Sequence, residues 1–124
     1  MKIILADREA QLMEILWERG PSTVAEVRER LQDDLAYTTV LTMLRTLEAK
    51  DYVRHAEQGR AHVYTAAIQR QAAQRSALTA LTAKLFKGSH ALLLTQLVSD
   101  ETLTEEEIKR IRKLIDIRSK RGKS

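Results

Sequence analysis

Residues 35–53 constrain the fold more than any other stretch, because their pattern predicts a helix with two contrasting faces. At about 100° per residue, one face is apolar and needs a protein core; it consists of Val40, Met43, Leu44 and Leu47. The opposite face carries small or hydroxyl-bearing side chains and one guanidinium, namely Thr38, Thr42, Arg45 and Ala49, with Leu41 and Thr46 at its edges. A helix must expose small side chains if its backbone is to enter a DNA groove, so we interpret this helix as a candidate recognition helix.

A hairpin pattern follows this helix directly. Residues 52–56 and 61–65 favour strands, and Gly59 supplies the positive φ for a turn between them. A small-faced polar helix followed by a hairpin is typical of the second half of a winged helix-turn-helix, in which the hairpin is the wing. We expect the polar side chains of this wing to hold the DNA backbone or to reach the minor groove; they are Arg54, Gln58, Arg60 and His62.

The residues before the candidate recognition helix supply the other half of the motif. We expect a first helix over residues 7–19, with Asp7 as its N-cap. Thr23 and Glu26 then form a capping-box pattern that begins a second helix, which ends around Gln32. Two short helices joined by a few residues match the helix-turn-helix unit.

The second half of the chain is predicted to be helical, over residues 68–87, over residues 90–98 and from residue 104 onward. Each helix carries an apolar stripe, and the stripes contain Leu78, Leu81, Leu85, Phe86, Leu93, Leu97, Ile108, Ile111, Leu114 and Ile115. Three short helices cannot easily bury these side chains alone, so we expect a second copy of the chain to cover them. The sequence therefore predicts a mainly α protein with a winged helix-turn-helix DNA-binding domain over residues 1–66 and a helical dimerisation domain over residues 67–124.

The composition excludes several classes of protein. An aromatic share of 4%, one Pro and four Gly favour helix packing over a β-sandwich. No apolar run approaches the ~18 residues that a membrane span needs, and Asp7 and Arg8 follow the first apolar residues too soon for a signal peptide. The absence of Cys fits a reducing cytoplasm and excludes thiolate metal sites and cysteine nucleophiles. We expect a cytoplasmic protein with no membrane insertion.

The net charge of +4 favours an anionic partner only weakly, because it is distributed unevenly. Residues 1–66 hold nine Lys/Arg and eleven Asp/Glu, a balance of −2, whereas residues 67–124 hold twelve and six, a balance of +6. Binding of nucleic acid must then depend on which face of residues 1–66 the cations occupy. The tail, residues 118–124, is basic and is expected to fray.

Enzyme chemistry has little support in this sequence. There is no Gly-rich phosphate loop, and His55, His62 and His90 lie in no recognisable nucleophile turn or metal spacing. We therefore expect no enzyme, no cofactor and no metal site. A hairpin that pairs His55 with His62 would leave a metal sensor as a third interpretation, beside the simpler one in which both are polar residues of the wing.

The candidate recognition helix is unusually rich in threonine, with Thr38, Thr39, Thr42 and Thr46 within nine positions. An ordinary solvated helix face does not favour Thr, because its branched Cβ loses rotamer freedom in a helix. Hydroxyls that bond phosphate oxygens and base edges, together with methyls that contact thymine, give a functional reason for this composition.

At these positions the chain resembles the penicillinase-repressor family, the BlaI/MecI-type transcriptional repressors. The resemblance is carried by Trp17, by Tyr37, Thr38, Thr39, Val40, Thr42, Leu44, Leu47 and Lys50, and by Gly59, Arg60, Ala61 and Tyr64 of the wing. It implies a homodimer with two N-terminal winged helices and an intertwined C-terminal module, bound to a palindromic operator that often lies upstream of β-lactam-resistance or stress genes. It also implies that Thr39 and Thr42 occupy positions of the family's recognition helix.

The departures from the family pattern carry further expectations. Some relatives have a basic residue where this chain has Leu41, and another where it has Thr46, so the base preference should differ. In staphylococcal members a sensor-activated protease cuts a bond that aligns with Gln96 and Leu97 here, which makes an indirectly acting membrane sensor protease a candidate partner. Copper-responsive relatives have a Cys-rich C-terminus, which this chain lacks.

The prediction is a homodimeric, sequence-specific repressor that occupies a palindromic DNA operator. The residues expected to contact DNA are Thr38, Thr39, Thr42, Arg45, Thr46, Arg54, Gln58, Arg60 and His62. The alternative from another class is a protein-interaction adaptor that uses the winged-helix fold without DNA, for which the acidic balance of residues 1–66 is the best support.

Overall fold

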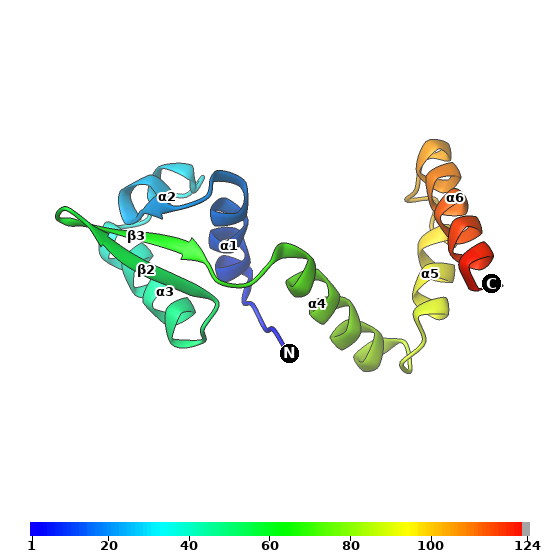
Figure 1. Cartoon of the computed structure of the whole chain (residues 1–124). Coiled ribbons are helices and arrows are strands. Elements are labelled where there is room, and N and C mark those ends of the chain that lie inside the picture. The colour runs from blue at the N-terminus through cyan, green and yellow to red at the C-terminus, as the bar shows by residue number, and fades with distance from the viewer. Residues whose placement is uncertain (123–124) are drawn as a thin grey trace. The chain divides into compact units, whose positions relative to one another are not determined.

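The computed structural model describes residues 1–122 of the chain. The chain divides into two compact units after Leu78, within the helix α4 (Arg70–Leu85), and the described part of the second unit is residues 79–122. Figure 1 labels the helices of both units and the strands β2 and β3, and each unit is described below by itself. The sequence indicates a boundary between residues 66 and 67, which lies before α4. The division into a DNA-binding domain and a dimerisation domain at this point stays a prediction.

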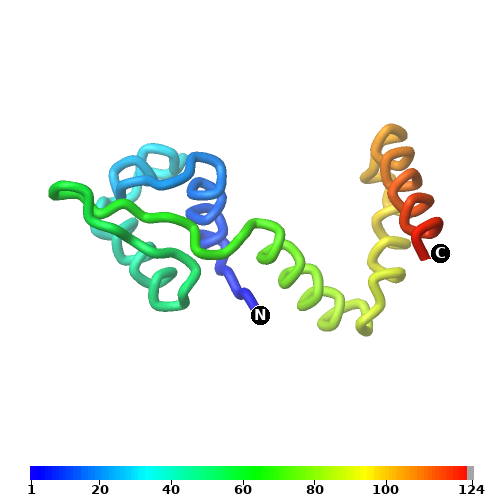
Figure 2. The backbone as a smooth tube through the Cα atoms, in the orientation of Figure 1, coloured from blue at the N-terminus to red at the C-terminus, as the bar shows by residue number. Residues whose placement is uncertain are grey.

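The first unit is a winged helix-turn-helix, as the sequence predicts. Its helices are α1 (Asp7–Arg19), α2 (Val24–Arg30) and α3 (Tyr37–Ala49), followed by the hairpin of β2 (Val53–Gln58) and β3 (Ala61–Ala66) and by the start of α4. A short strand, β1 (Ser22–Thr23), completes an antiparallel sheet in the order β1-β3-β2. The tip of the hairpin projects beyond the helices of this unit (Figure 2).

The core of this unit lies where the apolar faces of its helices meet the sheet. The most deeply buried side chains are Leu12 and Met13 of α1, Val27 of α2, Val40, Leu44 and Leu47 of α3, and Tyr64 of β3. The apolar face expected of α3 is therefore buried, except that Met43 is only half-buried. Because burial of this face fixes the rotation of α3, the face with Thr38, Thr42 and Arg45 is presented to solvent.

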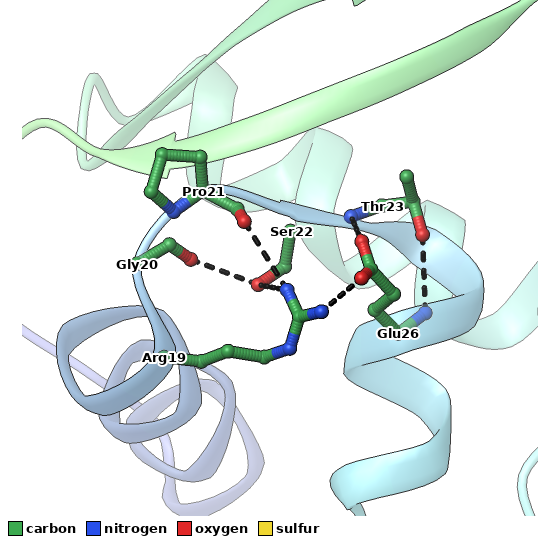
Figure 3. Close-up of polar contacts among 6 residues, drawn as sticks. All are labelled: Arg19, Gly20, Pro21, Ser22, Thr23 and Glu26. Carbon is green, nitrogen blue, oxygen red and sulfur yellow. Dashed lines mark hydrogen bonds and ion pairs between the residues drawn. The ribbon is translucent and has the colours of Figure 1, made fainter.

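The corner between α1 and α2 is held by side chains from both helices (Figure 3). Thr23 accepts a hydrogen bond from the Glu26 N–H at 3.2 Å, and Glu26 accepts one from the Thr23 N–H at 2.9 Å, so the capping box is confirmed. The Arg19 guanidinium pairs with Glu26 and also donates to Ser22 Oγ at 2.9 Å. The Thr23 N–H bond and then Arg19 hold the pKa of Glu26 below its ordinary value. This network fixes the angle at which α2 leaves α1.

Three local expectations for this unit need correction. The N-cap of α1 is Ala6 and not Asp7, which is the first residue of the helix; Ala6 has no side-chain oxygen to cap the first turn, and the Glu9 carboxylate accepts the Ala6 N–H at 2.8 Å. The α2 helix ends at Arg30, before the expected Gln32. Strand β1 was not expected, since only its pairing with Tyr64 and Val63 of β3 makes so short a segment a strand.

The second unit contains the end of α4, α5 (His90–Ser99) and α6 (Glu105–Gly122). Both expected caps are present: Ser89 Oγ accepts the Leu92 N–H at 3.2 Å, and Thr104 exchanges hydrogen bonds with Glu107 at 2.9 and 3.1 Å. The expectation of a frayed tail is wrong for residues 118–122, which continue α6; residues 123–124 lie outside the described part.

The helices of the second unit do not enclose a core of their own. Within residues 79–122, Thr82 is the one side chain that is fully buried, at 1% exposure. The apolar stripes expected from the sequence are half-buried at Phe86, Leu93, Ile108 and Ile111, and exposed at Leu78, Leu81, Leu85, Leu97, Leu114 and Ile115. Among the helices of residues 1–122, none is long and apolar enough to cross a membrane.

Candidate nucleic-acid interface

The solvent-facing side of α3 brings together five of the nine residues expected to contact DNA. Thr38, Thr39, Thr42, Arg45 and Thr46 are all exposed, on the side opposite the buried apolar face. The four threonines are small enough for another surface to approach the helix backbone closely. This face can therefore enter a groove of about the width of the DNA major groove, ~12 Å.

The threonine hydroxyls on this face are not equivalent. Thr42 Oγ1 donates to the Thr38 carbonyl at 2.9 Å, and Thr46 Oγ1 donates to the Thr42 carbonyl at 3.0 Å. Within residues 1–122 the hydroxyls of Thr38 and Thr39 make no such bond. The sequence pattern identified the four threonines but could not separate them, because hydroxyl bonding depends on the rotamer each one adopts.

The wing, α3 and the start of α2 line an open hollow of about 550 Å³. Arg45 of α3 lines it together with three of the expected wing residues, Gln58, Arg60 and His62. Tyr37, the first residue of α3, also lines it and is 47% exposed, although it was not among the residues expected to contact DNA. Two guanidiniums, an imidazole and a phenol around one hollow are chemically suited to an anionic group such as a phosphate.

Arg54 is not part of this hollow. It lies near the start of β2, directly after the buried Val53, and alternation places it on the same face of the strand as Gln58, four residues nearer the tip. Its exposed side chain is available to a partner outside the hollow.

The base of the wing is tied to α3 by a polar and aromatic cluster. His55 Nδ1 lies 2.6 and 2.8 Å from the two oxygens of Glu48, whose carboxylate also accepts the His55 N–H at 3.1 Å. The rings of His55 and His62 are stacked, with centroids 4.9 Å apart. Two stacked rings do not converge on a common point, and no cluster of three or more metal-ligating side chains occurs in residues 1–122. The contacts of this pair are therefore those of polar wing residues.

Tyr64 connects this cluster to Arg45. Burial raises the pKa of its hydroxyl and the Glu48 carboxylate raises it further, whereas the neighbouring Arg45 guanidinium opposes them. Tyr64 is 1% exposed and its ring lies 5.5 Å from that of His55. The neutral phenol thus gives Arg45 a fixed polar neighbour at the floor of the interface.

The cations of the first unit divide into paired and unpaired ones. Four of them pair with carboxylates, namely Lys50 with Glu9, Arg70 with Glu14, Arg19 with Glu26 and Arg8 with Asp33, and the Glu48 carboxylate lies beside His55. In the described part of the chain, Arg45, Arg54 and Arg60 form no ion pair with a carboxylate. One acidic side chain, Glu57, remains on the wing, 3.5 Å from His62.

Lys50 has a structural position behind the interface. Its ammonium lies 2.9 and 3.0 Å from the two carboxylate oxygens of Glu9 and so joins the end of α3 to the start of α1. Burial alone would raise the pKa of Glu9, but the Ala6 N–H and Lys50 together lower it below its ordinary value. This pair helps to fix the position of α3 on the core.

Comparison with known proteins agrees with this geometry. A family model described as penicillinase repressor matches residues 5–117. The chain belongs to the penicillinase repressor family. Members of this family are transcriptional repressors and not enzymes, so the expectation of no enzyme is confirmed.

Two curated relatives show how the similarity is distributed along the chain. The chain is 46% identical to the transcriptional regulator BlaI of Mycobacterium tuberculosis over 63 residues. This matched stretch covers 48% of this chain and 46% of that protein. The penicillinase repressor of Bacillus licheniformis is 22% identical over 121 residues, covering 96% and 94% of the two chains. The chain thus spans about half the length of the mycobacterial relative.

Solved structures support the fold. A MarR family protein from Bacillus stearothermophilus is similar with a TM-score of 0.52, over 98% of this chain and 78% of that chain, at 13% identity. At this identity the likeness concerns the winged-helix fold alone.

Proposed function

We propose that the chain is a homodimeric repressor that binds a palindromic DNA operator in the cytoplasm. The observation that carries the proposal is the exposed, threonine-rich face of α3 beside a hollow lined by Arg45 and Arg60, whose guanidiniums have no carboxylate partner within residues 1–122. Small side chains allow close approach to the bases, and available cations bind phosphates.

In this proposal α3 lies in the major groove. Thr38, Thr39, Thr42, Arg45 and Thr46 face base edges and nearby phosphates. Gln58, Arg60 and His62 border the hollow and hold a phosphate of the backbone, and Arg54 contacts the strand on the other side of the wing. Repression follows because a protein bound at the promoter excludes the transcription machinery.

The second unit supports the dimer. Its apolar side chains at Leu97, Leu114 and Ile115 are 42%, 62% and 52% exposed, and its described residues have almost no buried interior. Exposed apolar stripes of this kind need a partner surface, and a second copy of the chain offers a matching set of stripes. Two copies present two α3 helices, which suits half-sites about one helical turn, ~10 bp, or a multiple of it apart.

Relief of repression by proteolysis is a further part of the proposal. Gln96 and Leu97 are exposed on α5, within the element that would contribute to the dimer. Cleavage there by the protease of a membrane sensor would separate α6 from the rest of the chain and weaken the dimer.

The decisive experiment is selection of bound duplexes from a random pool, followed by titration of the selected duplex at two salt concentrations. Selective binding that weakens as salt rises is expected, together with a mass of two chains per duplex in sedimentation. No binding at low salt would remove the proposal and favour the protein-interaction adaptor.

A further inference from the structure

The four exposed threonines of α3 fall into two classes. Thr42 and Thr46 donate their hydroxyl hydrogens to helix carbonyls, at 2.9 and 3.0 Å, whereas the hydroxyls of Thr38 and Thr39 have no such acceptor in the described residues. The two classes occupy different parts of the helix, with the available hydroxyls in its first turn and the bonded ones further along.

A hydroxyl has a single hydrogen to donate. Once Thr42 or Thr46 has given that hydrogen to the helix, its side chain presents a methyl group and an acceptor lone pair. Rotation of the side chain to donate to a base would break the bond to the helix carbonyl, so such a contact gains little. The methyl group is the feature that remains available without any such loss.

In the major groove, thymine is the base that presents a methyl group, at C5. Thr42 and Thr46 are four residues apart, which is about 6 Å along the helix axis, so their methyls meet different base pairs. Contact between two methyl groups removes apolar surface from water and needs no hydrogen bond.

We propose that Thr42 and Thr46 select thymine by contact with its C5-methyl group, and that Thr38 and Thr39 supply the hydroxyl contacts of this face. The inference rests on the proposed DNA-binding function and names the chemical feature that the site recognises. A competing outcome is that the free lone pair of Thr42 or Thr46 accepts from the amino group of adenine or cytosine.

The test uses the full-length protein and the duplex selected from the random pool. Each thymine of a half-site is replaced in turn by deoxyuridine, which lacks the methyl group and keeps every hydrogen-bonding atom. We expect two positions in each half-site at which this replacement weakens binding about fourfold, the factor that corresponds to burial of about one methyl-sized group.

Protein variants assign those two positions. Thr42→Ser keeps the hydroxyl and removes the methyl, so it should lose the preference for thymine over deoxyuridine at one position. Thr42→Val keeps a methyl and removes the hydroxyl, so it should retain that preference. Thr46→Ser and Thr46→Val should behave in the same way at the other position. Thr39→Val is the matched control, since it removes an uncommitted hydroxyl and should weaken binding without changing any thymine preference.

Two results would overturn the inference. One is a selected duplex in which no deoxyuridine replacement changes affinity; the other is a Thr42→Ser protein that discriminates thymine as well as the parent does. A chain that binds no duplex selectively would defeat the proposed function itself, and this outcome is visible before any thymine is replaced. Circular dichroism of each variant shows that α3 remains helical.

Discussion

Replacement of Lys50 by methionine removes the ammonium that faces Glu9 while it keeps a side chain of similar length. The Glu9 carboxylate is 10% exposed, so in the variant a buried negative charge retains only the Ala6 N–H as a partner. A hydrogen bond to a charged group contributes about 1.5–3 kcal/mol. The Lys50 side chain is 40% exposed, and solvent screening reduces its share. We expect a loss of about 1–2 kcal/mol in the free energy of unfolding at pH 7.

The pH dependence identifies the cause of that loss. The folded-state pKa of Glu9 is lowered from 4.5, so its contribution to stability is present above that pH and is lost as the pH falls through the folded-state value. Without Lys50, burial raises the pKa of Glu9 and a proton removes the unpaired charge. The difference in stability between Lys50→Met and the parent should therefore shrink as the pH falls below about 4.5.

Urea unfolding followed by Trp17 fluorescence measures this effect. Trp17 is the one tryptophan of the chain, and its indole N–H donates to the Ile68 carbonyl at 2.9 Å, so its emission reports on the first unit. Lys2→Met is the matched control, because Lys2 is exposed and forms no ion pair within residues 1–122. Identical unfolding of the two variants at pH 7, or a Lys50→Met loss that persists unchanged at pH 3, would contradict this role of the Lys50–Glu9 pair.

Three other perturbations test separate parts of the proposal. Arg60→Ala should weaken binding to all duplexes alike and reduce the slope of log affinity against log salt by about one, measured by fluorescence titration; a change of sequence preference with an unchanged slope would contradict a phosphate contact. If Arg45 reads a guanine, Arg45→Ala should reduce the free energy of binding to the selected duplex by about 1–3 kcal/mol. A repeated selection with this variant should then show a relaxed preference at one base pair. Leu114→Glu should shift the sedimenting mass from two chains to one without loss of the helical signal of the first unit, and an unchanged mass would show that α6 does not form the dimer contact.

The sequence was sufficient wherever a signal is local. The Thr23 and Glu26 capping box and the Ser89 cap were predicted because a cap depends on residues three positions apart. The prediction of Asp7 as the N-cap was wrong, although Asp is an acceptable N-cap residue. The helix begins one residue earlier, where Glu9 bonds the Ala6 N–H, and Glu9 is itself held by Lys50, which is distant in the sequence. Strand β1 was missed because it exists only through its pairing with β3.

The candidate site was predictable to the same extent. The apolar period of α3 fixes which side faces solvent, so the exposed threonines and Arg45 could be named in advance. The hollow could not be predicted, because it depends on how the wing folds against α3. Sequence spacing alone does not show that Tyr37 lines this hollow or that Arg54 does not. The ion pairs of the first unit could not be predicted from local patterns either, because they join residues up to 56 positions apart, as Arg70 and Glu14 are.

The near absence of a buried interior in residues 79–122 has a consequence for how much of this protein a cell must make. In the proposed dimer, these apolar side chains are covered by another copy, so the unit becomes more stable as the chain becomes more abundant, since mass action adds the energy of association to that of folding. Below the dissociation constant, single chains would expose α5 and α6 and be open to general proteolysis. After dilution at cell division, degradation of single chains would add to the loss, so the amount of the protein would fall faster than by dilution alone. The protein would then persist only above a threshold concentration.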